Sequence, residues 1–184
     1  MLPVVWLVVA VVVAVVLTMW VTFTLTRLDR LHARVDAAQA ALDAQLVRRA
    51  AALQHAAQRP DSGAPDQRRP HYDKLAQQAL ASRTADTARE PIENAVGRGI
   101  AELVRLPLPP EYAAELHEAA ARVRIARRFY NDAVRDTRAL RARRMPRLLR
   151  MAGHREMPEF FDIDDTIPAA PAPHPEPVAE HERP

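Results

Sequence analysis

The side chains of this chain that could do chemistry are carboxylates and histidines, because the sequence contains no cysteine. That absence excludes disulfide scaffolds, thiolate nucleophiles and cysteine-based zinc sites. Two-metal centres in helical bundles need glutamates and Glu-x-x-His sets that project inward from facing helices, and the string ELHEAA, from Glu115 to Ala120, holds no such set. No phosphate-cradling loop or Ser/His/Asp arrangement is present either. The sequence therefore predicts no catalytic residue, no metal and no cofactor, and a protein that is not an enzyme.

The carboxylates of the string ARRFYNDAVRD, from Ala126 to Asp136, have a structural explanation. Asp132 and Asp136 stand four residues apart and can pair with Arg128, Arg135 or Arg138 on the surface of one helix. Such pairs contribute about 0.2–0.5 kcal/mol each. Asn131, beside Tyr130, could complete a polar network inside a bundle. We interpret this string as architectural.

An arginine-rich run follows the same string. Between Arg122 and Arg155 there are twelve arginines against two acids, and the end of the run interleaves these arginines with apolar residues. This pattern is typical of a segment that binds a surface, whose partner could be anionic lipid, an acidic protein or nucleic acid. The candidate contact residues for an anionic membrane or a protein partner are Arg143, Arg144, Arg147, Leu148, Leu149 and Arg150.

The N-terminal residues from Met1 to Thr26 carry no charged side chain. The apolar stretch from Pro3 to Leu25 is long enough, at about 1.5 Å per residue, to cross a hydrocarbon core about 30 Å thick. Arginines follow this stretch at once and none precedes it, so the positive-inside rule predicts an N-terminus outside and a cytoplasmic C-terminal part. Residues 1–26 are thus the predicted transmembrane anchor of a single-pass membrane protein.

The remaining chain predicts an all-α fold. Apolar positions recur at helical spacing in four stretches, with helices expected at about residues 26–59, 72–89, 91–106 and 111–145. The first is expected to continue the transmembrane helix, and a Pro- and Gly-containing loop over residues 60–71 ends it. We expect residues 27–150 to form an antiparallel up-and-down four-helix bundle with long coiled-coil-like helices.

The fourth stretch has the clearest pattern. Its seam follows alternating steps of four and three residues, and Tyr130 is a member. Phe129 and Ile125 form a second apolar strip, which we expect to be buried against another helix. The seam comprises Tyr112, Leu116, Ala119, Val123, Ala126, Tyr130, Ala133, Thr137 and Leu140.

The C-terminal part divides into two segments. We expect residues 151–167 to form an ordered extension that packs on the bundle. Residues 168–184 are rich in proline, carry almost no large apolar side chain and are expected to be disordered.

The string ARRFYNDAVRD closely resembles the hallmark of the LemA family, bacterial membrane-anchored helical proteins. RVDAAQAALDAQLVRR, from Arg34 to Arg49, resembles that family's first soluble helix, and EFFDID, from Glu159 to Asp164, resembles its closing segment. The chain departs from the family where Thr137 and Arg138 replace an aromatic residue and Asn. The resemblance implies a four-helix bundle behind one N-terminal span. It also implies structural roles for the motif residues Arg127, Arg128, Phe129, Tyr130, Asn131 and Val134.

These features together predict a membrane-anchored, LemA-like scaffold or interaction module at the inner membrane face. Its expected partners are the lipid bilayer and another protein. The alternative is a membrane-tethered nucleic-acid-binding protein that uses the arginine-rich end of the fourth helix on phosphates. The sequence makes nucleic acid the weaker choice, because aromatic side chains on a packed face cannot stack on bases.

Overall fold

The structure is a computed structural model that describes residues 2–82, 88–142 and 156–166. All regular secondary structure in these parts of the chain is helical, and they contain no β-strand. Four α-helices and one short 3₁₀ helix follow one another in the order α1 (Leu2–Gln58), η1 (Pro60–Ser62), α2 (Arg69–Ala81), α3 (Arg89–Leu103) and α4 (Pro110–Arg141). The all-α prediction is therefore confirmed for the described residues.

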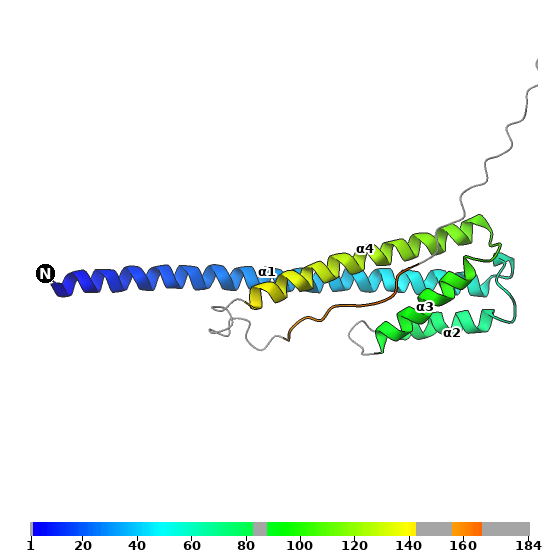
Figure 1. The fold of residues 1–184 in the computed structure, drawn as a ribbon, viewed down its shortest axis with the longest axis horizontal. Coiled ribbons are helices and arrows are strands. Elements are labelled where there is room, and N and C mark those ends of the chain that lie inside the picture. The colour runs from blue at the N-terminus through cyan, green and yellow to red at the C-terminus, as the bar shows by residue number, and fades with distance from the viewer. Residues whose placement is uncertain (1, 83–87, 143–155, 167–184) are drawn as a thin grey trace, which may run out of the picture.

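Helix α1 is one uninterrupted rod of 57 residues whose C-terminal half packs on the other helices (Figure 1). Among the described residues it is the one helix long and apolar enough to cross a membrane, with a mean hydropathy of 2.9 over its most apolar window. None of that window is buried against the rest of the chain. A run of exposed valines and leucines is unfavourable in water, which agrees with a candidate membrane span.

Helix α4 runs back along α1 in the opposite direction (Figure 1). Two contacts between the helices establish this direction, because Arg34 pairs with Asp136 at 2.9 Å and the His55 ring hydrogen-bonds Glu115 at 2.9 Å. The predicted seam of α4 is buried, with Ala126 half-buried and the other members 0–9% exposed. The alternating apolar spacing thus identified correctly the face of α4 that packs on α1.

The helices enclose two apolar cores placed along α1. The core farther from the N-terminus joins α1 and α2 to α3 and the first turns of α4, through residues such as Leu53, Tyr72, Ile100 and Leu116. Gly99 lies at this contact, where an added Cβ would make ordinary van der Waals contact with the Leu75 side chain at 3.4 Å. The packing of α2 on α3 therefore does not require a glycine at this position.

The second core lies nearer the apolar half of α1. It joins Leu42 and Leu46 of α1 to Val123 and Val134 of α4 and to the segment of residues 156–166, which we name the closing segment. Helix α4 packs chiefly on α1, and the closing segment fills the space between α4 and α3. This extended segment occupies a position that a helix–helix contact would otherwise fill.

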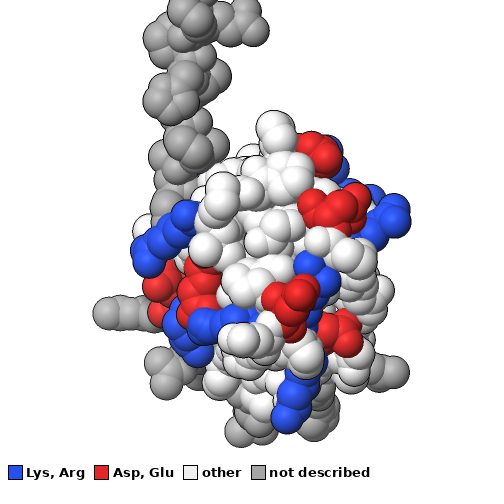
Figure 2. Space-filling model, turned by 90° about the vertical axis from the view of Figure 1, so that its right-hand side faces the viewer, with Lys and Arg blue, Asp and Glu red and all other residues white. Residues whose placement is uncertain are grey.

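The connections from α1 to α2 and from α3 to α4 lie at the end of the molecule opposite the N-terminus (Figure 1). The Ser62 hydroxyl donates to the Ala56 carbonyl, and Gly63 adopts a left-handed conformation with φ of 77°. A side chain there would also approach the Pro107 carbonyl oxygen at 3.2 Å, so glycine is required at this turn. Figure 2 shows that acidic and basic residues are interspersed over this end of the molecule, so it presents no large field of one sign.

Helix bounds differ from the expected ones mainly in the middle of the chain. Helix α2 begins at Arg69 rather than near Tyr72, with proline at its start, and α3 begins at Arg89 rather than Pro91. The arginine-rich residues 143–150, the expected end of the fourth helix at residue 145, and the tail 168–184 lie outside the described residues.

Candidate functional site

The string from Arg127 to Val134 divides between two sides of α4. Tyr130 and Val134 point into the second core, with exposed fractions of 7% and 0%. Phe129 is 63% exposed, and Arg128 is exposed as well. We call the side that holds the closing segment the segment side, and the opposite, uncovered side of the α1/α4 pair the groove side.

Tyr130 anchors the closing segment through its hydroxyl. The hydroxyl donates to the main-chain carbonyl of Glu159 at 2.9 Å. Burial raises the pKa of this phenol above its ordinary value, and the negative charges of Glu159 and Asp43 act in the same direction. The phenol is therefore a neutral donor at physiological pH, which satisfies the polar end of a buried aromatic side chain.

Asn131 forms two hydrogen bonds to one residue of the closing segment. Its side-chain amide nitrogen donates to the Phe161 carbonyl at 3.0 Å, and its amide oxygen accepts from the Phe161 N–H at 2.9 Å. An asparagine side chain carries both a donor and an acceptor. It can therefore make the two hydrogen bonds that a neighbouring strand would make to the main chain of one residue. Asn131 thus belongs to a polar network that holds an extended chain.

Arginines of α4 supply the rest of the contacts on that helix. Arg127 contacts Asp165 at 2.8 Å through charge-assisted hydrogen bonds, and both side chains are largely buried. Arg138 donates to the Pro158 carbonyl and stacks over the Phe160 ring, with 5.2 Å between the guanidinium carbon and the ring centroid. These arginines give the segment side a basic lining toward an acidic segment.

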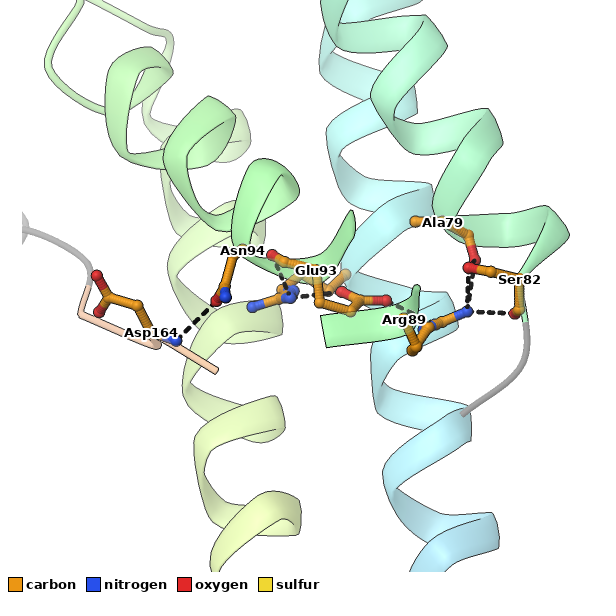
Figure 3. A network of polar contacts seen from close by, with 7 residues as sticks. Ala79, Ser82, Arg89, Glu93, Asn94 and Asp164 are labelled. Carbon is orange, nitrogen blue, oxygen red and sulfur yellow. Dashed lines mark hydrogen bonds and ion pairs between the residues drawn. The ribbon is translucent and has the colours of Figure 1, made fainter. Parts of the chain in front are cut away.

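Helix α3 holds the other edge of the closing segment. Glu90 accepts from the Asp162 N–H at 2.7 Å. Asn94 accepts from the Asp164 N–H at 2.8 Å (Figure 3). At Gly97 an added Cβ would lie 3.3 Å from the Asp164 carbonyl oxygen. A glycine that reduces helix propensity therefore permits the segment to lie directly on α3.

A buried cluster of charges lies beneath this contact. Glu93 is fully buried and pairs with Arg89 at 2.6 Å and also with Arg49 of α1. Arg89 also donates to the Ala79 carbonyl and to Ser82 at the end of α2 (Figure 3). One carboxylate thus pairs with two buried guanidinium groups, and the cluster links three helices because Arg89 also reaches α2. Losing the only negative charge of this cluster is costly.

The groove side exposes an apolar surface that the sequence places in the core. The prediction that Phe129 and Ile125 are buried is wrong, since they are 63% and 54% exposed. That prediction assumed partner helices on two sides of α4, whereas α1 covers one side and the closing segment another. A surface groove of about 400 Å³ remains, lined by Ala38, Ala41, Gln45, Arg122, Ile125, Ala126 and Phe129.

The structure also places the acidic residues of the string. Asp132 pairs with Arg135 at 2.8 Å on α4, as the sequence suggests. Asp136 instead pairs with Arg34 of α1. The predicted contact residues Arg143, Arg144, Arg147, Leu148, Leu149 and Arg150 lie outside the described residues.

Sequence reasoning missed Arg49, Arg89 and Glu93 as a buried cluster. One signal was present, because Arg49 occupies an apolar position in the helical pattern of α1. Within residues 2–82, 88–142 and 156–166, no group of three or more histidines or carboxylates could hold a metal ion. The chain matches no protein-family model, no curated protein and no solved structure in the comparisons with known proteins.

Proposed function

We propose that this chain is a membrane-anchored scaffold or interaction module of the LemA type, without enzymatic activity, in which an antiparallel, coiled-coil-like bundle presents the groove side to a protein partner. The observation that carries the proposal is the exposure of Ile125 and Phe129 over the small side chains of α1. The large apolar side chains can insert into a pocket of a partner, and the small alanine side chains leave space for a side chain of that partner. Such surfaces commonly mark contact sites with other proteins.

The proposed location is the inner face of a bacterial membrane, with the N-terminus outside and the bundle in the cytoplasm. The arginines after the apolar stretch support this orientation through the positive-inside rule. Protease added to cells with a permeabilised outer layer should leave the part from Arg27 to Pro184 intact. Digestion of that part would contradict the orientation.

The arginine-rich residues 143–150 are proposed to contact anionic lipid near the exit of the span. The ion pair between Arg34 and Asp136 supports this location, because it sets the last turns of α4 beside the first turns of α1 that follow the apolar stretch. Each basic residue near an anionic leaflet contributes about 1 kcal/mol. Vesicle flotation of a fragment starting at Arg27 tests the idea. A variant with Arg143, Arg144, Arg147 and Arg150 replaced by glutamine should lose binding to anionic vesicles at low salt.

Site-specific photo-crosslinking in intact cells tests the interaction module. A photoreactive residue placed at Phe129 or Ala41 should give a discrete crosslinked species. The same residue at Ala114, which is exposed on the same helix but outside the groove lining, is the control. Equal crosslinking from Ala114, or none from the groove positions, would reject the groove side as the contact surface.

A membrane-tethered nucleic-acid-binding protein is the second candidate. The exposure of Phe129, in a groove also lined by Arg122, favours it, because exposed aromatic rings beside arginines can stack on unpaired bases. Binding of single-stranded RNA or DNA by the full chain in neutral detergent should then weaken steeply with salt and with Phe129→Ala. Binding that ignores Phe129→Ala would exclude the stacking role.

A further inference from the structure

The closing segment lies on α3 and α4 as an extended peptide lies in a binding groove. Phe161 and Ile163 are 4% and 5% exposed, while Asp162 between them is exposed. This alternation is the two-residue period of an extended chain. The helices therefore receive the apolar side chains on one face of the segment and leave its acidic side chains near the surface.

Most of the polar contacts to the segment are made to its main chain. Tyr130 contacts a carbonyl, Asn131 contacts both groups of one residue, and Asn94 contacts an N–H. Such contacts require an extended backbone with the correct register. Two apolar side chains and the carboxylate that pairs with Arg127 add selectivity for the sequence of the occupant.

The chain that connects α4 to the closing segment is longer than its two ends require. Arg141 donates to the Glu156 carbonyl at 2.7 Å, so the ends approach within the reach of one arginine side chain. Residues 143–155 lie between them, and thirteen residues can extend to roughly 45 Å. The covalent connection therefore permits the segment to reach the groove of a neighbouring copy.

We propose that the segment-binding groove of α3 and α4 also accepts the closing segment of a second copy of this chain, so that copies exchange segments and become linked. The second copy is the occupant that the structure supports, because its segment repeats every contact seen within one chain. The candidate span keeps neighbouring copies in one bilayer and raises their local concentration. Exchange then increases with protein density in the membrane. This inference does not depend on the groove side or its partner.

The absence of cysteine permits a direct test by disulfide formation between two full-length copies. The first copy carries Glu90→Cys and the second carries Asp162→Cys, at positions joined across the groove by the hydrogen bond from the Asp162 main-chain N–H to the Glu90 carboxylate. They are mixed in detergent and reconstituted together in vesicles at rising protein-to-lipid ratios. A chain with both substitutions is the control, because it should form the disulfide within itself. We expect a disulfide between the two copies that increases several-fold with density.

Two further variants separate exchange from random collision. Phe161→Asp in the second copy removes the buried ring from the donated segment alone, while the first copy keeps its own intact segment as competitor, so the disulfide between copies should fall about tenfold, equivalent to about 1.4 kcal/mol. Ala114→Asp in the same copy, at an exposed position of α4 outside the groove lining, leaves the donated segment intact and should change nothing. The proposal is overturned if the control forms its internal disulfide while no disulfide between copies appears at any density. It is also overturned if Phe161→Asp in the second copy has no effect, or if the control chain forms no disulfide.

Discussion

Phe129 and Tyr130 are neighbours in the sequence, yet they belong to opposite sides of the same helix pair. Tyr130 is 7% exposed and its hydroxyl donates to the Glu159 carbonyl, whereas Phe129 is 63% exposed over a groove of small side chains. The segment side combines apolar burial with main-chain hydrogen bonds, and so it determines how the closing segment lies. The groove side makes no comparable contact among the described residues. Adjacent aromatic residues can therefore have opposite environments, one in the core and one at the surface.

The sharpest test of this contrast exchanges each aromatic residue for aspartate. Tyr130→Asp buries an unpaired charge and removes a packed ring, so we expect a loss of at least about 4 kcal/mol in the free energy of unfolding. Phe129→Asp should change that free energy by no more than about 0.5 kcal/mol. Urea unfolding of the full chain in detergent micelles, followed by circular dichroism, measures both. Equal and small effects would mean that Tyr130 is not part of the core.

Carboxylates give a second comparison between the buried cluster and the groove side. Glu93→Gln leaves Arg49 and Arg89 without a counter-charge in the interior, and we expect a loss of about 3 kcal/mol. The matched control is Glu118→Gln, which breaks the exposed pair with Arg122. That surface pair should contribute less than about 1 kcal/mol. A loss at Glu118 as large as that at Glu93 would contradict the assignment.

Asn131→Leu probes the segment side without adding a charge. Removing the side-chain amide leaves the Phe161 main-chain groups without their partners, at an expected cost of about 1–2 kcal/mol. Because the helices keep their own core, the loss should be local. Hydrogen exchange should become faster at the Phe161 amide and stay unchanged at the core residue Leu53. Global destabilisation with uniform exchange would show that the closing segment and the helices unfold together.

The smallest expected effect concerns acid and the end of the closing segment. The Asp164 carboxylate accepts from the Thr166 N–H at 3.0 Å, and this hydrogen bonding, assisted by Arg98, lowers the pKa of Asp164 below its ordinary value of 3.8. A lowered pKa means that the contribution is complete above pH 3.8 and is lost as the pH falls through the lower value. Nuclear magnetic resonance of the Thr166 amide should report this transition. Asp164→Asn should abolish it and leave Tyr130 contacts intact.

The length of the uncharged apolar stretch was sufficient to predict the N-terminal helix, and periodicity was sufficient to predict the buried face of α4. Those features depend on side-chain polarity repeated over many residues, which a sequence displays directly. The position of Phe129 was mispredicted because the sequence does not state which flanks of a helix receive a partner. An extended segment covers the flank that a helix was expected to cover, and it leaves Phe129 at the surface.

The closing segment itself could be predicted only in part. Its resemblance and its aromatic–acidic–aliphatic order suggested packing on the helices, and Phe161 and Ile163 are indeed buried. Its register could not be inferred, because Tyr130, Asn131 and Asn94 bind main-chain groups that every residue possesses. The glycine at position 97 was a usable signal, since a glycine within a helix often marks the close approach of another chain segment.

The continuity of α1 gives the proposed membrane orientation a geometric meaning. Because α1 has no break, the side of the bundle that faces a given direction depends on how the span is rotated about its axis. Each residue of the helix contributes a turn of about 100°. The same helix also sets the height of the groove. The residues from Thr26 to Gln58 extend over about 50 Å, and Ala41 lies about 23 Å above the end of the apolar stretch. Inserting two residues after Thr26 would raise the groove by only about 3 Å but would turn it by about 200°. Any neighbour in the same bilayer would then meet a different side of the bundle.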